Sequence, residues 1–140
     1  MKIIVAASGY FDPLHVGHIE SLELAKKLGD ELVVIVNNDE QTKLKKGYSF
    51  MNEQDRMKIV SSLKCVDRVV LSVDKDRSVC ESLRLVKPNI FAKGGDRTQD
   101  EIPESKVCKE FNIKIVDGLG AKIRSSSELV KNANINKEKQ

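Results

Sequence analysis

Residues 2–18 read KIIVAASGYFDPLHVGH, and this stretch holds the first predicted turn of the chain and both of its histidines. Its opening part, Lys2–Ala7, is an apolar run of the kind expected for a short strand. Gly9 follows and permits a tight turn. From Gly17 to Leu28 apolar residues recur at helical spacing. The stretch therefore predicts a strand, a turn and a helix in immediate succession.

The rest of the chain repeats this alternation. Further strands are expected at Leu32–Asn37, Arg68–Val73, Asn89–Ala92 and Ile113–Val116. Further helices are expected at Glu53–Leu63, Ser78–Val86 and Glu104–Phe111, with a last short helix from within Ser125–Ser127 to about Asn132. The alternation predicts a single α/β domain over residues 1–132, a Rossmann-like, doubly wound parallel sheet of about five strands in the order 3-2-1-4-5 with helices on both faces. Residues 133–140 are expected to be a frayed tail.

The composition limits the classes of function. Of the 140 residues, 32% are charged and 40% apolar, the mixture of a soluble globular protein. The net charge of +3 suits small anionic ligands. The sequence shows no long basic face, so nucleic-acid binding is not predicted. Three scattered cysteines, Cys65, Cys80 and Cys108, argue against a disulfide framework or a structural zinc site. The first apolar run is too short for a signal peptide or a membrane span, so no membrane association and a cytoplasmic location are expected.

The turn after the first strand has the features of a phosphate site. In a parallel sheet it lies at the carboxyl edge, where ligands bind, and the helix that follows directs unpaired N–H groups and the positive end of its dipole towards it. His15 and His18 are three residues apart and can lie on one side of that helix. Gly17 costs about 1 kcal/mol in an ordinary helix, and close approach of a base or phosphate explains it better. The alternatives are that the histidines are structural or that the two bind a metal ion, although a metal ion would need further ligands.

The string SGYFDPLHVGH, residues 8–18, resembles the signature GxFDxxHxGH of HIGH-type nucleotidyltransferases in the cytidylyltransferase-like branch. The resemblance extends to about Val130. Members of this family transfer a nucleotidyl group from a nucleoside triphosphate to a phosphorylated sugar or polyol and release pyrophosphate. The resemblance implies ATP or CTP as donor, Mg²⁺ with the triphosphate, a homodimer, and catalytic roles for His15 and His18. It also places Gly9, Tyr10, Phe11 and Gly17 beside the nucleotide.

A cluster of lysines follows the second strand, in a segment predicted to be a loop. By resemblance, Lys45 is catalytic and binds the nucleotide, Lys46 binds the nucleotide, and Lys43 binds the acceptor, although clustered lysines are usually solvated surface charge. Arg56 matches a basic residue used near the phosphates, and a surface ion pair with Asp55 or Glu53 is the alternative. The acceptor side is completed by Asp12 and Asp39. Asp12 is also expected to order the turn by accepting backbone N–H groups.

Two later motifs complete the predicted site. "KGGD" at residues 93–96 follows the fourth strand and is similar to the sequence of heptose 1-phosphate adenylyltransferases, which favours ATP over CTP. It places Lys93 on the acceptor and Gly95 and Asp96 on the nucleotide, and Lys75 matches a position that meets the acceptor's phosphate. The serines of "GAKIRSSSELV", Ser125, Ser126 and Ser127, can cap the last helix or hold the β- and γ-phosphates. Gly120 stands where the glycerol-3-phosphate branch has an arginine, and Lys122 or Arg124 can replace its charge.

Two other functions fit the same pocket. An FMN adenylyltransferase shares the architecture and would bind flavin. A nucleotide-binding module without catalysis would bind a triphosphate and release no pyrophosphate.

Overall fold

The computed structural model describes residues 1–94 and 102–119. The predictions for Gly95, Asp96, Lys122, Ser125–Ser127, the last helix and the tail lie outside these residues. The elements in chain order are β1 (Ile4–Gly9), α1 (Val16–Lys26), β2 (Glu31–Val36), α2 (Asp39–Lys46), α3 (Glu53–Ser61), β3 (Arg68–Leu71), α4 (Cys80–Val86), β4 (Ile90–Gly94), α5 (Glu104–Glu110) and β5 (Lys114–Leu119).

All five strands are parallel, in the order β3-β2-β1-β4-β5, so the predicted sheet is confirmed. The chain winds outward from β1 to β3 on one side and then crosses to β4 and β5 on the other. The order reverses between β1 and β4. The turn after β1 therefore lies at the switch point, where open α/β sheets bind ligands.

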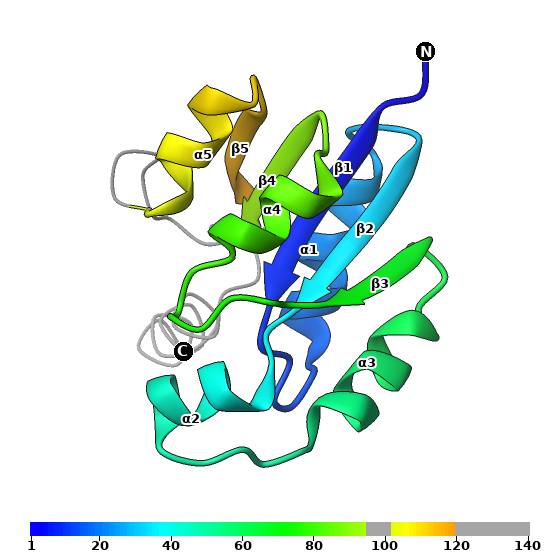
Figure 1. Cartoon of the computed structure of the whole chain (residues 1–140). Coiled ribbons are helices and arrows are strands. Elements are labelled where there is room, and N and C mark those ends of the chain that lie inside the picture. The colour runs from blue at the N-terminus through cyan, green and yellow to red at the C-terminus, as the bar shows by residue number, and fades with distance from the viewer. Residues whose placement is uncertain (95–101, 120–140) are drawn as a thin grey trace, which may run out of the picture.

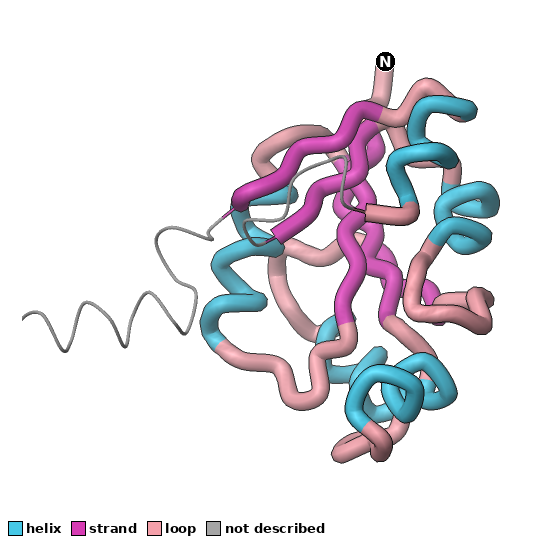
Figure 2. The backbone as a smooth tube through the Cα atoms, turned by 90° about the vertical axis from the view of Figure 1, so that its left-hand side faces the viewer, coloured by secondary structure: helices cyan, strands magenta, loops and turns pink. Residues whose placement is uncertain are grey.

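The sheet is covered on both faces because alternate residues of each strand point to opposite sides. Val5 and Ala7 of β1 pack in one cluster with residues of α1 and α3, whereas Ala6 packs in a second cluster with residues of α4 and α5. Figure 1 shows α4 in front of the sheet and α1 behind it, and Figure 2 shows strands between helices on both sides. Each Val or Leu side chain buried in this way stabilises the fold by about 1.5–3 kcal/mol.

The segment Asp39–Lys46 is a helix, so the prediction of a loop here was wrong. Asn38 caps it: its side chain accepts the backbone N–H of Gln41 at 2.9 Å, and the Gln41 side chain accepts the N–H of Asn38 at 3.0 Å. Gly47 ends the helix with a φ of 85°, a conformation that favours glycine. Acidic residues in the first turn and lysines in the last complement the helix dipole.

Candidate active site

The two histidines lie in the first turn of α1 and cap it. The Nδ1 of His15 accepts the backbone N–H of Gly17 at 3.1 Å, and the Nδ1 of His18 accepts the backbone N–H of His15 at 3.1 Å. The ring centroids are 3.8 Å apart, with 31° between the planes. The rings thus lie side by side at the start of the helix, as their spacing predicts.

These caps also determine which nitrogen of each ring carries the proton. A nitrogen that accepts a backbone N–H has no proton of its own, so the neutral ring carries its proton on Nε2. His15 and His18 therefore each have an Nε2–H group as a hydrogen-bond donor. The first turn of α1 contains no acidic residue, so no carboxylate in that turn neutralises the positive end of the helix dipole. Paired donors at this position suit the oxygens of an anion.

His18 is a neutral donor at physiological pH. Partial burial is the largest cause of a lowered pKa, followed by the electrostatic influence of His15 and then of Lys45, and together they lower the pKa of His18 from 6.5 to about 4. Protonation would also place a hydrogen on Nδ1, which would break the bond to the backbone N–H of His15. The ring therefore acts by donating a hydrogen bond from Nε2 and not by carrying a charge.

This lowered pKa predicts acid-sensitive stability. Because the unfolded chain binds a proton at His18 near pH 6.5 and the folded chain binds it only near pH 4, stability falls as pH drops through that range. Urea unfolding of the wild type and of His18→Asn between pH 7.5 and 4 measures this loss. The wild type should lose more stability than the variant, and identical pH profiles for the two proteins would contradict the assignment.

Asp12 orders the turn. Its carboxylate accepts the backbone N–H groups of Phe50 at 2.8 Å and Met51 at 2.7 Å, and the Lys46 ammonium lies 3.1 Å away. Burial by itself would raise the pKa of Asp12, but these donors outweigh it and hold the pKa below its usual value. The side chain is 1% exposed. Asp12 therefore ties the turn after β1 to the loop before α3, and both of its oxygens are engaged by these donors.

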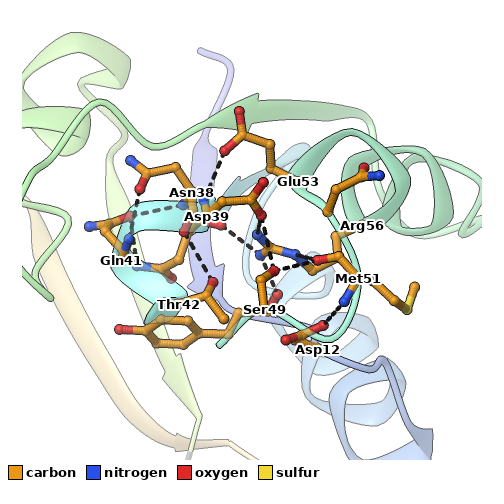
Figure 3. Close-up of polar contacts among 12 residues, drawn as sticks. Asp12, Asn38, Asp39, Gln41, Thr42, Ser49, Met51, Glu53 and Arg56 are labelled. Carbon is orange, nitrogen blue, oxygen red and sulfur yellow. Dashed lines mark hydrogen bonds and ion pairs between the residues drawn. The ribbon is translucent and has the colours of Figure 1, made fainter. Parts of the chain in front are cut away.

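Arg56 is fully buried and pairs with Asp39, so the alternative of a surface ion pair with Asp55 or Glu53 does not hold. Its guanidinium donates to the carbonyls of Met51 (2.9 Å), Tyr10 (2.8 Å) and Asn37 (2.6 Å) and to the carboxylate of Asp39 (2.7 Å). Figure 3 shows Arg56 directed towards Asp39 and Met51. Arg56 holds together the loops after β1 and β2 and the loop before α3. In this structure its contacts are with the protein itself.

Asp39 is the acidic partner of Arg56. Its Oδ1 also accepts the Ser49 hydroxyl at 3.1 Å, and its backbone N–H donates to Glu53 at 2.8 Å. Burial would raise the pKa of Asp39, but Arg56 and the other donors outweigh it and lower the pKa. Asp39 thus links α2 to α3. This link gives it a structural role, whether or not the exposed part of its side chain contacts a ligand.

Formation of α2 separates the predicted lysine cluster. Residues two apart on a helix lie about 200° apart around its axis, so Lys43 and Lys45 point to different sides. The Lys45 ammonium lies 4.3 Å from the centroid of the Tyr10 ring. Lys46 donates to the Asp12 carbonyl at 2.8 Å as well as to its carboxylate. Lys43 lies 3.6 Å from Glu40. Of these three lysines, Lys45 and Lys46 therefore contact the turn after β1, whereas Lys43 pairs with Glu40.

An open pocket of about 840 Å³ lies on the Lys43 side of α2. It brings together three residues predicted for the acceptor: Asp39, Lys43 and Lys75. Asp74 also lines it, and sequence reasoning missed this residue. Its carboxylate accepts the backbone N–H groups of Glu81 at 2.8 Å and Ser82 at 2.9 Å at the start of α4. Asp74 precedes the first residue of α4 by six positions, so the spacing rules for helix caps do not point to it.

Gly9 and Phe11 shape the turn. Phe11 is buried, and a Cβ at Gly9 would lie 2.6 Å from its ring, so glycine is required at this position by packing within the turn itself. The Phe11 ring meets His18 edge-on, with centroids 5.1 Å apart. Lys93 lies in β4, the strand beside β1 at the switch point. Within residues 1–94 and 102–119, no group of three or more His, Cys, Asp or Glu side chains is arranged to hold a metal.

Comparisons with known proteins show the family of the chain. Residues 6–133 match the cytidylyltransferase-like family, and the chain belongs to this family of nucleotidyltransferases. It is similar to the FAD synthase of Pyrococcus abyssi, with 42% identity over 115 residues that cover 81% of this chain and 77% of that protein. It is also 39% identical over 117 residues to the bifunctional protein HldE of Desulfatibacillum aliphaticivorans, and the match covers 82% of this chain.

The chain spans about a quarter of the HldE protein, since the match covers 24% of its length. Among solved structures, the lipopolysaccharide core biosynthesis protein of Thermoplasma volcanium is 36% identical with a TM-score of 0.71. That match covers 84% of this chain and 96% of the other. The likeness thus extends over nearly the whole of that protein. In the part of this chain that the structure describes, no helix has the length and apolar character to cross a lipid bilayer.

Proposed function

We propose that this protein transfers an adenylyl group from ATP to the phosphate of a small phosphorylated sugar or polyol and releases pyrophosphate. The observation that carries the proposal is the pair of Nε2–H donors at the start of α1, which lies at the switch point of the sheet. ATP is favoured over CTP because the similar protein from Pyrococcus abyssi is an FAD synthase, whose product contains an adenylyl group. The "KGGD" string at residues 93–96 favours the same nucleotide.

The reaction needs no general base, because the acceptor's phosphate oxygen is already anionic. That oxygen forms a bond to the α-phosphorus as the bond from the α-phosphorus to the bridging oxygen breaks, and pyrophosphate leaves with the electron pair. The rate enhancement then comes from alignment and from donors placed where charge develops. His15 and His18 would donate to oxygens of the α- and β-phosphates, and Lys45 would neutralise charge. Mg²⁺ would arrive with the triphosphate, since Asp12 and Asp39 are engaged by other donors.

The pocket beside α2 supports a phosphorylated acceptor. Lys43 and Lys75 line it and supply positive charge, which suits the acceptor's phosphate. Asp39 and Asp74 also line it, but their carboxylates already accept hydrogen bonds, from Arg56 and from backbone N–H groups at the start of α4 respectively.

FMN is the second candidate acceptor. The observation that favours it is the 42% identity to an FAD synthase of which the match covers 77%. A second FAD synthase, from Aciduliprofundum boonei, is 41% identical, and the match covers 73% of it. FMN adenylylation would use the same histidines and the same in-line step.

A pyrophosphate-release screen tests the proposal. ATP, CTP, GTP and UTP are each combined with phosphorylated sugars, polyol phosphates and FMN in the presence of Mg²⁺. We expect release with ATP and one class of acceptor only. Release with FMN alone would replace the sugar acceptor by flavin, and release with CTP alone would overturn the adenylyl assignment. Nucleotide binding with no release under any combination would indicate a binding module without catalysis.

A further inference from the structure

Tyr10 lies in the turn after β1, at the x position of the GxFD string, and its ring faces α2. The Lys45 ammonium lies 4.3 Å from the ring centroid, within the range of a cation–π contact. Burial is the largest influence on the Tyr10 hydroxyl and raises its pKa, so the ring is an uncharged phenol. The attraction therefore comes from the π face of the ring and does not require the hydroxyl.

The same ammonium also acts on His18. The charge of Lys45 is one of the three causes that lower the pKa of His18, after burial and the influence of His15. Lys45 thus contacts the ring of Tyr10 and exerts its charge on His18, at the carboxyl edge of β1. A cation near the start of α1 adds a positive charge where an anion would bind.

A contact with the Tyr10 ring restricts where the Lys45 ammonium lies. Lys45 is exposed on α2, and its long side chain loses conformational freedom when one arrangement is favoured. Lys46, the next residue, is held differently: its ammonium donates to the carbonyl and the carboxylate of Asp12. Lys46 also lies 5.2 Å from the ring of Tyr48, but the Asp12 contacts would hold it without that ring. The two lysines therefore form an internal comparison.

We infer that Tyr10 is a positioning residue, whose ring face holds the Lys45 ammonium beside His15 and His18 so that it meets the triphosphate. The inference rests on the proposed function in taking the anion to be a triphosphate. Without the ring, the Lys45 ammonium loses this contact and should contribute less to the stabilisation of charge at the phosphates. The acceptor's phosphate brings its own binding contacts, so its KM should not follow this change.

The experiment compares Tyr10→Leu, Tyr10→Phe and Tyr48→Leu in two measurements. The first is pyrophosphate release at varied ATP. Tyr10→Leu should lower kcat/KM for ATP by roughly tenfold, whereas Tyr10→Phe keeps the ring face and should stay within about twofold of the wild type. Tyr48→Leu makes the same change beside Lys46 and should also stay within about twofold. Thermal melting of each variant shows that it is folded.

The second measurement is an NMR titration of the two histidines in the ligand-free protein, which does not depend on any activity. Tyr10→Leu should raise the pKa of His18 from its value of about 4, and Tyr10→Phe should leave it unchanged. Lys45→Met should raise it as well, and adding Tyr10→Leu to Lys45→Met should have no further effect. If no acceptor supports turnover in the wild type, the proposed function fails, and this titration still decides the role of Tyr10.

Several outcomes would overturn the inference. Wild-type kcat/KM and an unchanged His18 pKa in Tyr10→Leu would show that the ring does not hold Lys45. An equal loss in Tyr10→Phe would assign the effect to the hydroxyl. An equal loss in Tyr48→Leu, or a persisting effect of Tyr10→Leu in the Lys45→Met background, would show that the effect does not pass through Lys45.

Discussion

The His18→Asn variant is expected to release pyrophosphate at about one hundredth of the wild-type rate or less while staying folded. Asparagine carries an oxygen near the position of the histidine Nδ1, so it can still accept the backbone N–H of His15 and cap α1. It has no group at the position of Nε2. The variant therefore removes the donor proposed to act on the phosphates and keeps the structural bond. Initial rates at saturating ATP and acceptor measure the loss.

His18→Gln and His18→Ala separate the two functions of the ring. Glutamine can place an amide N–H near the position of Nε2 but not an acceptor at Nδ1, so it should retain more activity than asparagine at lower stability. Alanine loses both groups and should be inactive and less stable by about 1 kcal/mol, the usual cost of a lost cap. Turnover near the wild-type level in His18→Asn would mean that the ring serves only as a cap.

The fold could be predicted because its strands are buried on both faces and therefore read as continuous apolar runs. The ends of elements were less predictable. β1 was expected at Lys2–Ala7 and is observed at Ile4–Gly9, because pairing with β2 continues through Ser8 and Gly9 up to Val36. A polar residue and a glycine at the end of a strand carry no apolar signal. The neighbouring strand, and not the local sequence, decided where β1 ends.

The helix α2 could have been found from its ends but not from its middle. Its eight residues, DEQTKLKK, contain one large apolar side chain and so show no apolar periodicity. The capping signals were nevertheless present: Asn38 before the helix, Gln41 at the third helical position and Gly47 after it. Without this helix the lysines read as one cluster. With it, Lys43 is directed away from Lys45, which changes the residues that can act on a phosphate.

The role of Arg56 could not be predicted because its partners are distant in the sequence. The carbonyls of Tyr10 and Asn37 precede it by 46 and 19 residues. An arginine in a charged stretch such as EQDRMKIV is ordinarily exposed, and nothing in its spacing shows that three loops fold over it. The same holds for Asp12, whose acceptors are filled by the backbone of Phe50 and Met51.

Replacement of Arg56 by methionine is expected to lower the free energy of unfolding by about 3–5 kcal/mol. Methionine fills much of the volume, but it leaves the Asp39 carboxylate without its buried cation and three backbone carbonyls without their donor. Urea denaturation followed by circular dichroism measures the change. Arg68→Met is the matched control. Arg68 is half-exposed and lies 3.4 Å from Glu31, so its loss should cost about 0.5 kcal/mol or less.

Arg56→Met also decides between the two roles that a basic residue at this position can have. A residue that binds phosphate would, when replaced, lower turnover and leave stability nearly unchanged. A residue that holds loops together would lower stability first, and activity would fall because Tyr10, Asn37 and Asp39 lose their common anchor. Arg56→Lys should be intermediate, since one ammonium cannot reach all four acceptors at once. Wild-type stability in Arg56→Met together with lost turnover would assign Arg56 to the phosphates after all, and would require the buried guanidinium to become accessible when nucleotide binds.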